Sequence, residues 1–229
     1  NDKQCEEFNS ALLVSKNQIH SLAFESCANF NVAINELFVI HGIERFTLAD
    51  TTLSFVQAKN LLTSVHSGAN HLKSLNFFNL TFNFSCADSQ KREQELKSDL
   101  LAVIQQCETL ESLCLSRMKN LPVDSLCKTI SKLSKLKRLE LKGCTLGSSS
   151  TIQNLTQLMH AIEQCIKNSR HVEYLDLAEL FPVSFNVLDC QPLASPLFSL
   201  LQTLVNSCKH SLQHLNLAGL TLVDDSLNH

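Results

Sequence analysis

The stretch from Leu136 to Leu146 limits what this chain can fold into more than any other part of the sequence. It reads Leu-Lys-Arg-Leu-Glu-Leu-Lys-Gly-Cys-Thr-Leu, with leucine at positions one, four, six and eleven and cysteine at position nine. Side chains alternate between the two faces of a strand, so positions four and six lie on one face and positions three, five and seven on the other. Six other stretches follow this template less closely. Their position-one residues are Ile19, Ile43, Leu72, Leu110, Val172 and Leu212.

The position-one residues are separated by 24, 29, 38, 26, 36 and 40 residues. A heptad repeat or a β-helix has a constant period, whereas short strands joined by helices of different lengths can have this variable one. Apolar residues between the stretches recur at helical spacing, as from Ile152 to Ile166. We expect Ser150 to open that helix. We expect a loop in the sixth repeat, through Phe181 and Pro182 to Pro196. The sequence predicts strands near 19–25, 43–49, 72–78, 110–116, 136–142, 172–178 and 212–218.

This L-x-x-L-x-L-x-x-N/C-x-L pattern resembles the leucine-rich repeat of the ribonuclease-inhibitor type, over about residues 19 to 222. The resemblance implies an α/β solenoid in the shape of a horseshoe, with a parallel sheet on the concave face, helices on the convex face and about seven irregular repeats. Position nine departs from the usual asparagine, whose side chain satisfies backbone groups at the corner of each repeat. We therefore expect irregular stacking. The departures are Thr51, Leu80, Met118, Leu180 and Leu220.

Two domains are expected from this pattern. Residues 1–18 precede the first repeat and are interpreted as an N-terminal cap that covers the open edge of the first strand. Residues 19–229 form the leucine-rich repeat domain. The chain stops where the next helix would begin, which would leave the last strand with an uncovered parallel edge. We therefore expect the domain to be truncated at its C-terminus.

Composition narrows the function classes. The net charge is −3 without a long run of one sign, so nonspecific attraction to nucleic acid is not expected. No apolar run reaches the ~18 residues of a membrane span. The ten cysteines are scattered without a C-x-x-C motif, which favours reduced, buried thiols in a cytosolic, reducing compartment. Three glycosylation sequons, which begin at Asn79, Asn83 and Asn154, would matter only in a secretory lumen.

Large and charged side chains are predicted on the concave face of the last three repeats, whereas the first four repeats place small, mostly polar residues there. Interfaces between proteins favour Tyr, Arg and paired charges at their anchor points. The alternative is that a solvated sheet face is polar without binding anything. The candidate partner-binding residues are Arg138, Glu140, Lys142, Tyr174, Asp176 and His214.

Two patterns invite a catalytic or metal-binding interpretation. Cys208, His210 and His214 have spacings that zinc ligands could use, but Cys208 fits a buried helical stripe and His214 the concave face. Cys114 is predicted to point outward from a strand, as a nucleophile would, yet no histidine falls in the neighbouring rows. No glycine-rich phosphate loop is present. We expect no catalytic residues, no metal and no cofactor.

The most favoured function is a non-enzymatic module that recognises a protein partner on its concave face, since the family resemblance implies protein ligands. The Asn, Lys, Ser and Phe bias also resembles leucine-rich repeat effectors that intracellular bacteria such as Legionella secrete into host cells. The alternative is that the chain is the substrate-recognition region of a larger enzyme or of a ubiquitin-ligase receptor. A passive structural scaffold is a third possibility. The oligomeric state does not follow from the sequence.

Overall fold

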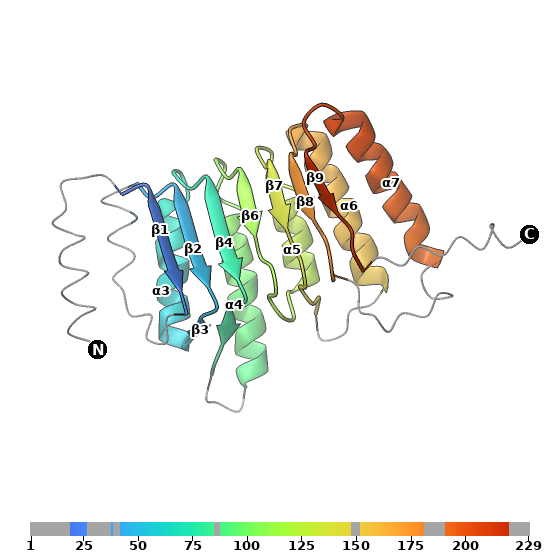
Figure 1. The fold of residues 1–229 in the computed structure, drawn as a ribbon. Helices are drawn as coiled ribbons and strands as arrows, with labels where there is room; N and C mark the ends of the chain where they lie inside the picture. Colours follow the sequence, from blue (N-terminus) through green and yellow to red (C-terminus); the bar gives the residue numbers. More distant parts are fainter. Residues whose placement is uncertain are drawn as a thin grey trace, which may run out of the picture.

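A computed structural model describes residues 19–26, 38, 42–84, 88–147, 152–180 and 191–219 of the chain. These residues form two layers, a parallel β-sheet on one side and a row of α-helices on the other (Figure 1). The chain is therefore an α/β protein whose parallel sheet and helices are consistent with a leucine-rich repeat-like fold. The predicted cap over residues 1–18 lies outside the described residues, so the division into two domains stays a prediction.

The larger sheet has seven strands in the order β1-β2-β4-β6-β7-β8-β9, and every neighbouring pair is parallel. Position three pairs with position three throughout, from Ser21 and Arg45 at one end to Tyr174 and His214 at the other. The register therefore never shifts. The strands are β1 (Ser21–Glu25), β2 (Arg45–Ala49), β4 (Ser74–Phe78), β6 (Ser112–Cys114), β7 (Arg138–Glu140), β8 (Tyr174–Asp176) and β9 (His214–Asn216).

Backbone hydrogen bonds beyond both ends of the strands extend this regular pairing. Each position-two carbonyl accepts two amide hydrogens from the next stretch, as Glu111 accepts from Lys137 at 2.7 Å and from Arg138 at 2.9 Å. Position eight follows each strand with a left-handed backbone, and its amide donates to the position-seven carbonyl of the next stretch. The seven left-handed residues are Ser26, Asp50, Asn79, Arg117, Gly143, Glu179 and Gly219, with φ between 47° and 89°.

The strands stack regularly, in contrast to the expectation of irregular stacking. The helices between them still differ in length. The corner amides are satisfied by the neighbouring stretch, so an asparagine at position nine is not needed for them. Leu80, Met118 and Leu180 are instead buried in the core, at 3% exposure or less. Thr51 is also buried, and its hydroxyl donates to the Ala49 carbonyl at 2.8 Å.

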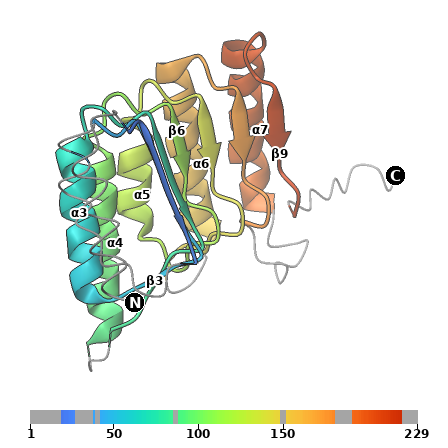
Figure 2. The ribbon, with the colours of Figure 1, turned by 60° about the vertical axis from the view of Figure 1, so that its left-hand side comes forward.

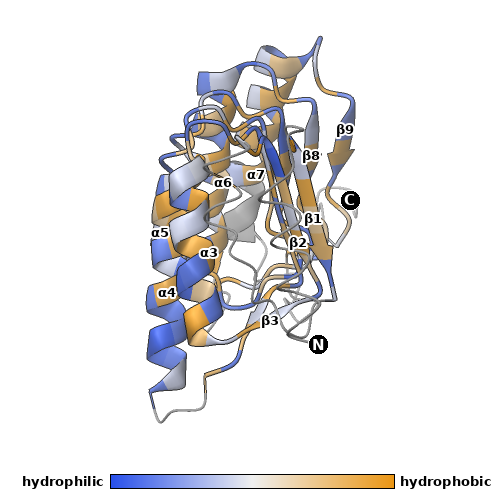
Figure 3. Ribbon diagram, turned by 90° about the vertical axis from the view of Figure 1, so that its left-hand side faces the viewer, coloured by the Kyte–Doolittle hydropathy of each residue, from blue (hydrophilic) through white to orange (hydrophobic). Residues whose placement is uncertain are grey.

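Helices of different lengths cover one face of the sheet (Figure 2). Seen from the β1 end, the helices and the strands form separate layers (Figure 3). A small second sheet, β3 (Thr52–Leu53) paired with β5 (Thr81–Phe82), continues two of the corners. The helices are α3 (Phe55–Gly68), α4 (Ser89–Ile104), α5 (Val123–Ile130), α6 (Ile152–Ser169) and α7 (Gln191–Cys208).

Two helix starts differ from expectation or were not foreseen. α7 begins before Pro196, which lies inside the helix and not in the preceding loop. Three buried leucines, Leu197, Leu200 and Leu204, hold this helix against the core and outweigh the backbone hydrogen bond that proline cannot donate. α3 opens with a capping box in which the Ser54 side chain accepts from the amide of Gln57. The predicted start at Ser150 lies outside the described residues.

Leucines at positions four and six form the central core between the sheet and the helices. Those within or directly after β6, β7 and β8 are at most 2% exposed: Leu113, Leu115, Leu139, Leu141, Leu175 and Leu177. A phenylalanine takes one of these two positions in each of the first three strands, as Phe24, Phe46 and Phe77 do, and the Phe46 and Phe77 ring centroids are 6.2 Å apart. The same two positions thus hold different side chains along one continuous core.

Position two carries side chains of alternating charge along one edge of the sheet. The Lys73 ammonium is 2.8 Å from the Glu44 carboxylate, and Lys137 is 2.8 Å from Glu111. The hydrogen bond from Lys73 lowers the pKa of Glu44, and the hydrogen bond to Glu111 raises the pKa of Lys137. Both pairs are exposed, so they support the register more than they contribute to stability.

The first prediction tests the core. Substituting Leu139→Ala should lower the free energy of unfolding by about 2–5 kcal/mol, because the side chain is 2% exposed and its loss leaves a cavity. The control, Val56→Ala on α3, removes a side chain that is 66% exposed, and it should change stability by less than about 0.5 kcal/mol. Urea denaturation measures both values. Equal losses in the two variants would contradict the layered core.

The second prediction concerns the ion pair between Glu44 and Lys73. Because the folded pKa of Glu44 lies below its ordinary value of 4.5, the pair stabilises the fold above that pH, and the stabilisation disappears as the pH falls through the lowered pKa. Urea denaturation of Glu44→Gln should therefore show a weaker dependence of stability on pH in this acidic range than the native chain. Glu108→Gln, which removes an exposed carboxylate outside the pair, is the charge-matched control against which the effect of Glu44→Gln is judged.

Candidate surface for partner recognition

The face of the sheet away from the helices, called the open face below, carries the side chains at positions three, five and seven. The structure brings the six candidate residues together on three adjacent strands. Arg138 pairs in register with Tyr174, and Tyr174 with His214. The second row runs from Glu140 to Asp176, and Lys142 follows the end of β7. Residues from three predicted repeats thus form one patch.

The first row is a stack of three flat groups. The Arg138 guanidinium carbon lies 3.7 Å from the centroid of the Tyr174 ring. On the other side, the His214 ring lies 4.1 Å from the Tyr174 ring, and the two planes are 7° from parallel. Neighbouring strands in a sheet are about 4.8 Å apart, which places groups at the same position at stacking distance. A cation over an aromatic face is attracted by the ring quadrupole. This Arg138–Tyr174–His214 stack is therefore ordered by the backbone register.

Two acidic side chains neutralise cations of the patch. The Glu140 carboxylate bonds the Nε atom of Arg138, and only 20% of the Glu140 side chain is exposed. Lys142 lies 3.5 Å from Glu179, and both of these side chains are more exposed. Glu140 therefore orients the guanidinium over the tyrosine, whereas Lys142 and Glu179 form a looser surface pair.

Asp176 has a different role from the other five candidates. Its side chain is 5% exposed, and its Oδ1 atom accepts a hydrogen bond of 3.0 Å from the amide of Ala178. Asn216 accepts from the amide of Ala218 in the same way on the next strand. Asp176 thus lies on the open face as predicted but turns back on the chain, so it supports the end of β8 and does not present its carboxylate to a partner.

Arg117 was not predicted as a site residue, although it contributes to the same face. Its guanidinium carbon lies 5.3 Å from the centroid of the Phe78 ring on the neighbouring strand. Arg117 is the left-handed residue at position eight, directly after the outward-facing positions three, five and seven of the template. The recurrence of Ser, Asp, Asn and Gly at position eight was the available signal, since these residues tolerate left-handed backbone.

The residues with a possible catalytic or metal-binding role, among them Cys114, Cys208 and His214, lie in different environments. Burial raises the pKa of the Cys114 thiol, which is 6% exposed and donates to the Ser116 hydroxyl at 3.4 Å. A nucleophilic cysteine needs a lowered pKa, so this environment disfavours the thiolate. Cys208 is 1% exposed within the core, whereas His214 lies in the exposed stack. Within the described ranges, no three His, Cys, Asp or Glu side chains gather in a metal-binding group.

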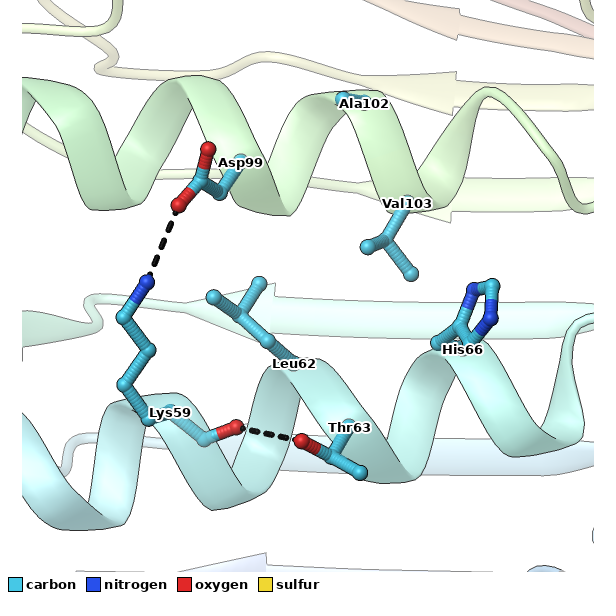
Figure 4. Close-up of a pocket in the computed structure, with 7 residues that line it drawn as sticks. All are labelled: Lys59, Leu62, Thr63, His66, Asp99, Ala102 and Val103. Carbon is cyan, nitrogen blue, oxygen red and sulfur yellow. Dashed lines mark hydrogen bonds and ion pairs between the residues drawn. The ribbon is translucent and has the colours of Figure 1, made fainter.

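A shallow groove of about 400 Å³ lies between α3 and α4, on the helix side (Figure 4). Leu62 and Val103 point into it, and a 3.1 Å ion pair between Lys59 and Asp99 crosses one end. The open-face patch lies on the other side of the sheet. The groove and the patch are thus separate surfaces.

Comparison with known proteins gives little further information. No protein-family model matches the chain, and no curated protein matches it. Among solved structures, the tropomodulin C-terminal domain of Caenorhabditis elegans is similar with a TM-score of 0.48 and 17% identity, and the alignment covers 72% of this chain and 95% of that one. A likeness at this level does not identify a family, so the fold assignment depends on the strand pairing. In the described part of the chain, no helix has the length and apolarity needed to cross a bilayer.

The third prediction uses Tyr174 as its own reporter, because the chain has one tyrosine and no tryptophan. Desolvation raises the pKa of Tyr174 above its ordinary value of 10, Glu140 raises it further, and Arg138 opposes the rise. Ultraviolet absorbance of the phenolate should therefore titrate at higher pH in the folded chain than in the denatured chain. Glu140→Gln should lower the folded pKa and Arg138→Gln should raise it. Identical folded and denatured titrations would contradict the stack, provided that circular dichroism shows the protein still folded.

Proposed function

We propose that the chain is a non-enzymatic protein-recognition module that binds a protein partner through the open-face patch. In this proposal the open face is the concave face of a horseshoe-shaped leucine-rich repeat solenoid with about seven irregular repeats. The observation that carries the proposal is the Arg138–Tyr174–His214 stack, a set of planar side chains ordered before any partner arrives. Arg and Tyr are the residues that most often anchor protein interfaces.

Rigidity supports this role. Each strand of the sheet adds one row of side chains, and the backbone bonds beyond both ends of neighbouring strands fix the spacing of the rows. Binding to such a surface orders few groups, so little conformational entropy is lost. Arg138 is already held by Glu140, and Tyr174 lies between two flat neighbours. A partner would gain contacts without first organising the site.

The patch also favours a partner with both charged and aromatic or apolar groups. Cations and carboxylates alternate across it, so a surface of one sign would meet repulsion as well as attraction.

The six described free cysteines are buried or half-buried, which supports a reducing compartment as the place of action. Bacterial origin, secretion into a host cell and membership of a larger enzyme or ubiquitin-ligase receptor stay predictions from the sequence.

The fourth prediction tests the patch directly. The native chain and the variant Arg138→Ala/Tyr174→Ala/His214→Ala serve as baits in eukaryotic cytosolic lysate. We expect a protein captured by the native chain to bind the variant at least about tenfold more weakly, because anchor side chains dominate binding energy. Asp176 is left unchanged because its carboxylate holds the backbone of Ala178.

The matched control is Arg92→Ala/Lys128→Ala/Gln164→Ala, which removes three exposed side chains on the helix side. Circular dichroism must show that every bait is folded. Capture that is lost in the control but kept in the patch variant would move the binding site to the helices. Equal capture by all three baits would exclude both surfaces as the anchor of the interaction.

A further inference from the structure

The outer face of α7 exposes large apolar side chains at the β9 end of the protein. Phe198 is 69% exposed and Val205 is 65% exposed. They lie about two helical turns apart and therefore on the same side of the helix. Leu201, between them, is half-buried against the core. Figure 1 shows that α7 and β9 together form one end of the two layers.

α7 is docked firmly by its inner face, so this exposure is a property of the surface and not of a loose helix. Leu197, Leu200 and Leu204 are at most 1% exposed. The Glu163 carboxylate of α6 accepts hydrogen bonds of 3.2 Å from the Ser199 hydroxyl and 3.2 Å from the Thr203 hydroxyl. The outer side chains therefore point away from a fixed scaffold.

α7 also contains no Asp, Glu, Lys, Arg or His in its eighteen residues. Each of the other four described helices carries charged residues on its surface, as α4 does with Lys91 and Arg92. Solvated helices normally have a charged outer face, whereas the centres of protein interfaces are depleted of charge. α7 thus has the low charge of a covered surface, and its exposed polar residues, such as Gln202 and Asn206, are uncharged.

β9 continues the same surface in the sheet layer. Leu215 occupies position four and is 38% exposed, although Leu139 and Leu175 at that position are at most 2% exposed. β9 is the last strand in the sheet order. By the bonding pattern of the preceding strands, the carbonyl of Gln213 and the amide of Gly219 face outward from this edge. Such an edge is a template for pairing with another strand.

We propose that this surface, made of Phe198, Val205 and Leu215 with the outer edge of β9, binds a second copy of the chain. A two-fold axis perpendicular to the sheet would place β9 antiparallel to β9 of the copy and α7 antiparallel to α7, so that strand layer meets strand layer and helix layer meets helix layer. The pairing would bury the exposed side chains of both copies together.

Charge favours an identical partner. In a symmetric interface the residues near the two-fold axis meet their own copies, so a cluster of like charge at the centre of the interface would be repulsive. The outer face of α7 has no charge to repel its copy. The residue directly after the helix in the sequence is a cation, Lys209. In an antiparallel helix pair the two copies of Lys209 would lie at opposite ends.

The test is the mass of the full chain in solution, measured by light scattering during gel filtration over a range of concentrations. We expect twice the monomer mass of 25.6 kDa, falling to the monomer on dilution. Val205→Lys should raise the dissociation constant by about tenfold or more, because it places a charge at the centre of the contact. Val56→Lys is the matched control, since Val56 is 66% exposed on α3 at the other end of the helix layer, and it should not change the dissociation constant.

Three results would overturn the proposal. The native chain could stay monomeric at every concentration. A dimer could form with equal affinity in both variants, which would place the contact elsewhere. A monomer could lose thermal stability with Val205→Lys and not with Val56→Lys, which would show that another part of the same chain covers the surface. Partner capture by the open-face patch is measured separately, with variants that leave α7 unchanged, so failure of this proposal can be told apart from failure of the proposed function.

Discussion

The hydrogen bonds that join successive strands beyond both of their ends are the constraint on which the rest of the structure depends. At one end each position-two carbonyl accepts two amides from the next stretch, and at the other each position-eight amide donates to the next position-seven carbonyl. Because both ends of each strand are fixed to the next strand, the register stays constant whatever the length of the connecting helix. Helices as different as α5, with eight residues, and α6, with eighteen, can therefore follow equivalent strands.

This arrangement requires left-handed backbone at position eight, including five residues that are not glycine: Ser26, Asp50, Asn79, Arg117 and Glu179. Left-handed backbone costs an L-residue roughly 1–2 kcal/mol, and the amide bond to the next stretch offsets part of that cost. The same backbone brings position-eight side chains into contact with the open face, where Arg117 stacks on Phe78 and Glu179 meets Lys142. Backbone strain at the corners thus widens the surface available for recognition.

The sequence was sufficient to predict which residues lie on each face, because alternate burial in a short strand depends only on the spacing of the apolar residues. Leu139 and Leu141 are buried where the template places them, and Arg138, Tyr174 and His214 are aligned because the register is constant. Exposure within a face could not be predicted in this way. Asp176 bonds to the amide two residues further along the chain, which alternation does not reveal.

Helix boundaries were less predictable for a related reason. Proline is a strong local signal against a helix interior, yet Pro196 lies inside α7. The buried leucines that follow it in this helix pack into the core and hold the helix in place. Tertiary burial of several side chains outweighs one missing backbone bond. Local propensity therefore fails where the energy comes from contacts between elements that are distant in the sequence, and it succeeds in the strands, where each stretch repeats the same contacts.

In a stacked array each layer buries its faces only against its two neighbours, so the repeat pattern alone does not determine which layer is the last. At the β9 end the next layer is missing among the described residues, and Phe198, Val205 and Leu215 are exposed there. His214 belongs to this last strand and also to the stack on the open face. In the proposed pair of chains the two stacks would lie on one continuous sheet, close to the axis that relates them. A partner that contacts His214 would then also reach the boundary between the copies, so pairing at the end and recognition on the face would share a residue and influence each other through direct contact.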